Sequence, residues 1–106
     1  MYDSSMYGST SSVLSTAVDS DSDSGDVLST GIASAYGILM VKETTTGISA
    51  YYKLIGTNHR LSDGDLEFSA TKDTASAINI YYESGAFQIQ NLLDNDLFIT
   101  AALLEF

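Results

Sequence analysis

The 106-residue chain contains no cysteine, no proline and no tryptophan. Without cysteine, no disulfide can stabilise the fold and no thiolate can bind a metal ion. The absence of cysteine leaves the redox compartment of the protein open. A chain of this length forms a single domain with a modest core, so association with further subunits is the simplest remaining source of stability.

Basic residues are also scarce, since four Lys and Arg stand against 14 Asp and Glu and give a net charge of −10. A nucleic acid backbone or an anionic membrane surface would be repelled, so we expect neither as a partner. No apolar run reaches the roughly 20 residues of a membrane-spanning helix. The first residues lack the basic and apolar regions of a secretory signal, so we expect none.

The chain changes in composition at about residue 30. Residues 1–30 are rich in Ser, Thr, Gly and Asp, and residues 19–26 read DSDSDSGD. Such a segment buries too little apolar surface to offset the entropy lost on ordering, although Val13, Leu14, Ala17 and Val18 interrupt it. We predict an extended N-terminal arm over residues 1–30 and a β-sandwich domain over residues 31–106.

Beyond residue 30, short runs of β-branched, aromatic and aliphatic residues alternate with turn sequences. This pattern predicts an all-β fold, an antiparallel β-sandwich or a jelly-roll-like domain. The expected strands lie near residues 32–43, 48–56, 65–71, 76–83, 86–92 and 97–105. The last segment contains good helix formers at 101–104, but residues 98–100 favour a strand.

Two turn sequences predict strand registers. Ser84-Gly85 has the length and composition of a two-residue hairpin turn, and residues 44–47 fit a four-residue loop. The registers around Ser84-Gly85 divide the two strands into one apolar and one polar face, as in half-buried antiparallel strands. The predicted cross-strand pairs are Tyr82 with Phe87, Ile80 with Ile89, Tyr81 with Gln88, Asn79 with Gln90, Leu39 with Tyr52, and Val41 with Ala50.

Two predicted strands are apolar on both faces, over residues 36–41 and 97–104. In an isolated two-sheet sandwich each of them should present one polar face to water, and an exposed apolar patch is typical of a protein interface. We therefore predict a homo-oligomer, with a trimer favoured over a dimer. The expected interface residues are Ile38, Met40, Tyr51, Tyr81, Phe98, Ala102 and Leu104. Alternatively, the N-terminal arm folds over this face within one subunit.

Catalytic candidates are weak. His59 is the one histidine, and we interpret it as an exposed loop residue, because no G-x-S-x-G element accompanies it. Asp63, Asp65 and Glu67 alternate near a glycine, and this arrangement fits turn chemistry better than the paired carboxylates of a glycosidase. We therefore predict that the chain is not an enzyme and holds no cofactor.

A calcium loop is the closest metal-binding candidate. Asp19, Asp21 and Asp23 are spaced like the start of an EF-hand loop. However, Gly25 comes one position late, and the twelfth position is Thr30 instead of glutamate. The EF-hand is rejected and we predict no metal site, while weak calcium binding by the clustered carboxylates stays open.

Tyrosines supply the alternative functions. In Tyr51-Tyr52 and Tyr81-Tyr82 neighbouring side chains point to opposite faces of a strand, so one of each pair faces away from the core. An exposed tyrosine can stack on a sugar or anchor a protein. A carbohydrate-binding module using Tyr51 or Tyr81 is therefore one alternative. A pilus-like subunit that donates residues 11–18 to a neighbour is another, although adjacent apolar residues in that segment spoil the required alternation.

Residues 69–91, which include TKDTASAINIYY at 71–82, resemble segments of small virion structural proteins of tailed bacteriophages. These include fibre, appendage and capsid-decoration domains. The strand at 36–41 fits the same pattern, and the resemblance spans roughly residues 35–106. It implies a β-sandwich in the virion, commonly trimeric and attached to a capsid or tail, whose serine-rich arm contacts other virion proteins. No functional residue is carried over from it.

Overall fold

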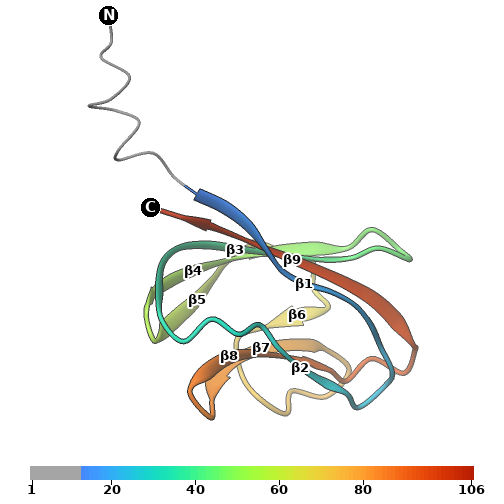
Figure 1. Ribbon diagram of the computed structural model, residues 1–106. Helices are drawn as coiled ribbons and strands as arrows, with labels where there is room; N and C mark the ends of the chain where they lie inside the picture. The colour runs from blue at the N-terminus through green and yellow to red at the C-terminus, as the bar shows by residue number, and fades with distance from the viewer. Residues whose placement is uncertain (1–12) are drawn as a thin grey trace, which may run out of the picture.

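The computed structural model describes residues 13–106, which form two β-sheets packed face to face (Figure 1). In spatial order, the five-stranded sheet contains β1 (Val13–Ser22), β9 (Leu97–Glu105), β3 (Ala35–Glu43), β4 (Ser49–Gly56) and β5 (Asn58–Gly64). The four-stranded sheet contains β2 (Val27–Ser29), β8 (Ala86–Asn91), β7 (Ile78–Glu83) and β6 (Phe68–Ser69). Every strand pair is antiparallel except β6 with β7. The predicted all-β sandwich is confirmed.

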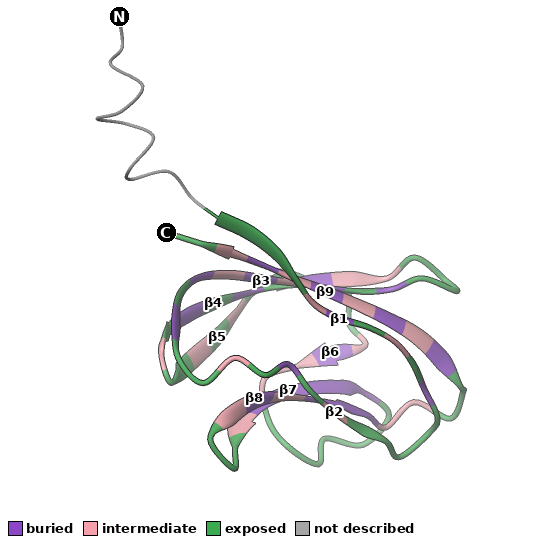
Figure 2. Ribbon diagram, viewed as in Figure 1, coloured by how far each residue is buried: buried purple, intermediate pink, exposed green. Residues whose placement is uncertain are grey.

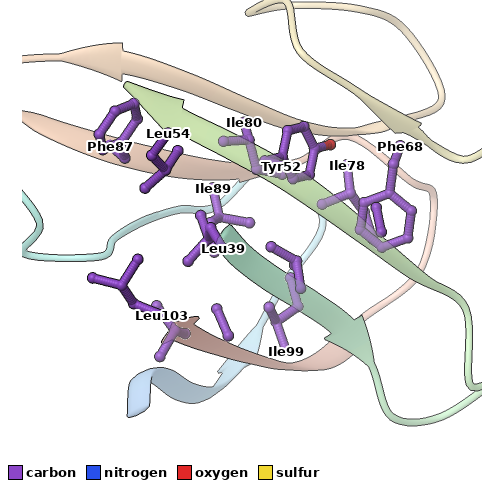
Figure 3. Close-up of a cluster of buried hydrophobic side chains, with 14 of the residues drawn as sticks. Leu39, Tyr52, Leu54, Phe68, Ile78, Ile80, Phe87, Ile89, Ile99 and Leu103 are labelled. Atoms are coloured by element: carbon purple, nitrogen blue, oxygen red, sulfur yellow. The ribbon is translucent and has the colours of Figure 1, made fainter. Parts of the chain in front are cut away.

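The hydrophobic core fills the space between the two sheets (Figure 3). Side chains alternate along a strand, so the inward positions of β3 and β4 place Leu39, Tyr52 and Leu54 over the four-stranded sheet. Tyr52 also donates a hydrogen bond from its hydroxyl to the Ser69 carbonyl at 2.7 Å. The largest fully buried apolar side chains are Tyr52, Phe87, Leu39, Leu54, Ile78, Ile80, Ile89, Ile99 and Val41.

The predicted registers are confirmed at both hairpins. All six predicted cross-strand pairs occur in β3–β4 and β7–β8. Ser84 and Gly85 both have positive φ angles, of 56° and 81°, as the type I′ turn of a two-residue hairpin requires. In the β3–β4 loop the Glu43 amide donates to the Ile48 carbonyl at 2.9 Å. The turn sequences therefore predicted both registers correctly.

The strand predicted at residues 65–71 is wrong. The chain forms β5 at Asn58–Gly64 and only the two-residue β6 at Phe68–Ser69, with a turn between them. β5 is an edge strand that pairs with β4 alone, so its polar residues can face water and do not give the apolar signal of a central strand. The ambiguous tail at residues 97–105 forms β9, as predicted.

The predicted arm over residues 1–30 must be corrected. Residues 13–22 form β1, which pairs with β9 along its length, and residues 27–29 form β2, which pairs with β8. An edge strand needs few apolar side chains, and in β1 only Val18 and Ser22 are buried. The described part of the segment lies beside β9 in the sheet and does not cover a face. Residues 1–12 lie outside the described residues.

A loop covers the polar outer face of the four-stranded sheet. Between β6 and β7, the backbone amide of Asp73 donates to Gln90 Oε1 at 2.9 Å, and Gln90 Nε2 donates to Asp73 Oδ1 at 2.8 Å. Asn79 Nδ2 donates to the Thr74 carbonyl at 3.0 Å. Asn79 and Gln90 are consequently buried, although the sequence predicted a water-exposed polar face.

Candidate functional site

The outer face of the five-stranded sheet is the candidate functional site. We use "outer face" for the side chains of β1, β9, β3, β4 and β5 that point away from the four-stranded sheet. Cross-strand pairing places Leu14, Leu104 and Ile38 in one row across three neighbouring strands, and Met40 lies between Ala102 and Tyr51 in the next row. The apolar side chains on the outer face are Leu14, Tyr36, Ile38, Met40, Tyr51, Ile55, Phe98, Ala102 and Leu104, with Phe106 following the end of β9.

One copy of the chain leaves this apolar surface in water. Leu14 is 64% exposed, Tyr36 is 62% exposed and Phe106 is 70% exposed. Ile38 and Met40 are only partly buried, because their neighbours are other side chains of the same flat surface. The exposure continues along the first half of β1 (Figure 2). Contiguous apolar surface of this kind is typical of a site that binds a partner.

Six of the seven predicted interface residues lie together on the outer face: Ile38, Met40, Tyr51, Phe98, Ala102 and Leu104. Tyr81 is the exception. It lies on the outer side of the opposite sheet and is only 6% exposed, with Lys72 Nζ 5.5 Å from the centre of its ring. Burial raises the pKa of the Tyr81 hydroxyl, and the nearby Lys72 charge partly offsets this rise.

Four exposed members of the outer face are absent from the sequence prediction: Leu14, Tyr36, Ile55 and Phe106. Tyr36 has the same strand parity as Ile38 and Met40, so alternation along β3 could have identified it. Ile55 follows from the predicted β3–β4 register, which places it opposite Tyr36. No sequence pattern indicated Leu14, because its place on the outer face depends on the pairing of β1 with β9.

A shallow groove of about 570 Å³ crosses the outer face. Its base includes the small residues Thr100 and Ala102 of β9, whose short side chains leave room between the larger neighbours. Asp19 lines the groove from β1, whereas Met40 comes from β3 and Tyr51 from β4. The groove therefore combines an aromatic ring with polar and charged side chains, a combination that small-ligand sites share.

Glu43 is a buried carboxylate at the end of β3, next to the groove. It accepts hydrogen bonds from the backbone amides of Thr45 and Thr46 and from the Thr46 hydroxyl. Burial disfavours its charged form, but the hydrogen bonds from Thr46 and Thr45 outweigh this effect and lower the pKa of Glu43. The carboxylate therefore holds the β3–β4 loop in its conformation without a basic partner in residues 13–106.

His59 is not the exposed loop residue that the sequence suggested. It lies in β5 opposite Leu54 and is partly buried. Its Nε2 donates to the Ala70 carbonyl at 2.9 Å, and its ring packs edge-on against Phe87 with centroids 5.9 Å apart. These contacts give the imidazole a structural role between β5 and the four-stranded sheet.

The acidic residues 19, 21 and 23 do not lie in one loop. Asp19 and Asp21 lie within β1, and Asp23 begins the turn to β2. In that turn the Asp23 amide donates to Asp26 Oδ2 at 2.8 Å. Among residues 13–106, no three His, Cys, Asp or Glu side chains are grouped closely enough to hold a metal ion.

Residues 13–106 include no helix with the length and apolar character needed to cross a membrane.

Comparison with known proteins gives no relative. A scan of protein-family models found no match, and searches of curated proteins and of solved structures found none either. The functional argument therefore depends on the geometry and chemistry of the outer face.

Proposed function

We propose that this protein is a structural component that self-assembles through the outer face of its five-stranded sheet. The main evidence is the contiguous apolar surface from Leu14 on β1 to Ile55 on β4, much of which is exposed in one copy. Burying such a surface removes apolar area from water, and the resulting free energy drives association. The role is non-catalytic, and the homo-oligomer is a trimer in the arrangement that we favour.

The size of the face supports this proposal. Five strands about 4.8 Å apart, with eight or so residues rising about 3.3 Å each, give a surface of roughly 24 by 27 Å. This corresponds to a flat area of roughly 650 Å² per subunit, and protruding side chains add to it. A standard protein interface buries about 800 Å² on each partner. The outer face is thus about as large as one side of a stable protein interface.

The oligomeric mass tests self-assembly. We expect light scattering to give a multiple of the 11.3 kDa chain mass for the unchanged protein and a monomer for Leu104→Asp. Leu66→Asp is the matched control, because Leu66 is fully exposed in the turn after β5 and lies off the outer face. Circular dichroism checks that both variants fold. A monomeric unchanged protein would contradict the proposal.

The assembly that we propose is a bacteriophage virion, in which the protein serves as a capsid-decoration, fibre or tail-attachment component. The resemblance of residues 69–91 to such proteins supports this location, and an exposed apolar face on each copy suits a repeated part of a particle. Mass spectrometry should detect the chain in purified virions of the phage that carries its gene. Its absence from those virions, or a gene outside any phage genome, would contradict the location.

A second candidate function is carbohydrate binding in the groove of the outer face. Tyr51 is exposed in the groove, and Thr100 and Asp19 line the same groove from β9 and β1, so a sugar chain could stack on the tyrosine and hydrogen-bond to these polar side chains. Titration of a glycan panel should then show binding that Tyr51→Ala abolishes. Tyr36→Ala is the control, because Tyr36 is an exposed tyrosine of the same face outside the groove. Specific binding by a monomer would favour this function over self-assembly.

A further inference from the structure

The outer face carries a charge pattern that differs from the rest of the chain. Three of the four basic residues of this strongly acidic protein point outward from its strands, and only three acidic residues accompany them. The face is therefore close to neutral, although the net charge of the chain is −10. Its charged residues are Lys42, Lys53, Arg60, Asp19, Asp21 and Asp63.

The two bases at the β4–β5 border are directly opposite each other. Lys53 of β4 pairs in register with Arg60 of β5, and like charges in that position destabilise a sheet. Within residues 13–106, the salt bridge of Lys72 with Glu83 is the one ion pair that forms. Neither Lys53 nor Arg60 therefore forms an ion pair within the described residues, so an acidic group from another molecule would relieve their repulsion.

Asp19 and Asp21 form the corresponding acidic pair at the β1 border. They are two residues apart in one strand, so both carboxylates point outward, opposite Thr100 and Phe98 of β9. β1 and β4 are separated by β9 and β3, a distance of about 14 Å across the sheet. The acidic pair is too far from Lys53 to form an ion pair within one copy.

We propose that Asp19 and Asp21 of one copy bind Lys53 and Arg60 of a neighbouring copy, while the apolar surface between the two borders is buried. This inference rests on the proposed self-assembly and adds which borders of the face meet. We favour a second copy of the chain as the partner, because the outer face contains both an acidic pair and a basic pair that could bind each other. Apolar contact is non-directional, whereas paired charges orient the subunits and reject other arrangements.

Charge reversal tests the pairing. Asp19→Lys with Asp21→Lys, and separately Lys53→Glu with Arg60→Glu, should each raise the subunit dissociation constant at least about tenfold at low salt. The quadruple variant restores opposite charges across the interface, so its dissociation constant should return to within about threefold of that of the unchanged protein. High salt should reduce the differences between variants, because it screens partly exposed charges. Analytical ultracentrifugation measures all four proteins.

Matched variants separate the pairing from general charge effects. Asp94→Lys with Asp96→Lys makes the same charge change in the exposed turn before β9, off the outer face, and should leave the dissociation constant unchanged. Asp19→Asn with Asp21→Asn should weaken association less than reversal does, and it repeats the test if the reversed variants fail to fold. An oligomer that is insensitive to reversal, or a quadruple variant weaker than both double variants, would overturn the pairing and leave self-assembly standing. A monomeric unchanged protein would remove both.

Discussion

At the residue scale, Glu43 shows how a carboxylate can be stably buried without a basic partner. Its three hydrogen-bond donors all come from the adjacent Thr45 and Thr46, so the charge stabilises the loop that it belongs to. The pKa of Glu43 is lower in the folded chain than its ordinary value of 4.5. Its contribution to stability is therefore fully present above the unfolded pKa and is lost as the pH falls through the folded pKa.

Glu43→Gln should lower the free energy of unfolding at neutral pH by about 1–3 kcal/mol, because an amide accepts weaker hydrogen bonds than a carboxylate and turns a donor toward the loop amides. The difference from the unchanged protein should shrink as the pH falls below the ordinary pKa of 4.5. Urea denaturation at neutral and acidic pH measures it. Glu105→Gln is the control, at the exposed end of β9. A difference that does not change with pH would contradict the role of the ionised carboxylate.

At the element scale, β1 is a strand of the sandwich. Val18 is 7% exposed and packs in the core, whereas Val13 in the same strand is 60% exposed. Val18→Ala should cost about 2 kcal/mol of folding free energy, because it removes buried methyl groups and leaves a cavity. Val13→Ala should change stability by less than about 0.5 kcal/mol. Chemical denaturation compares the two, and equal small effects would indicate that residues 13–22 are a loose arm.

The β7–β8 hairpin turn offers an opposite test, in which stability should increase. Ser84 has a φ of 56°, a left-handed conformation that asparagine adopts more readily than serine. Ser84→Asn should therefore stabilise the fold by up to about 1 kcal/mol. Ser15→Asn, at an exposed position of β1, is the control and should bring no gain. A thermal melt with no increase for Ser84→Asn would argue against the type I′ turn.

At the scale of the whole molecule, folding and assembly are coupled in our proposal. Association stabilises the folded state by mass action, so the melting temperature of the unchanged protein should rise with protein concentration. Met40→Asp places a charge in the centre of the outer face and should remove this dependence, because the charge would have to be desolvated on assembly. Val27→Asp, an exposed substitution on the other sheet, should keep it. Differential scanning calorimetry over a range of concentrations measures the effect, and a melting temperature independent of concentration would contradict the coupling.

The alternation of apolar and polar residues and the composition of the turns by themselves determined the fold class and the pairing of two hairpins. They identified the all-β class, the registers of both hairpins, and the two-sided apolar character of β3 and β9. These features are local, since the side-chain period of a strand and the φ angles of a two-residue turn depend on neighbouring residues only. Ile38, Met40 and Leu104 could be chosen as surface candidates for the same reason.

Tertiary structure alone decided the features that depend on distant partners. Asp19 and Asp21 look like part of a disordered acidic segment, but pairing with β9 makes that segment an edge strand. Tyr81 has the parity of an exposed residue, but the loop that carries Lys72 covers it. These contacts join residues that are far apart in the chain. The apolar and polar alternation within either segment therefore does not predict which strands pair or which residues a loop covers.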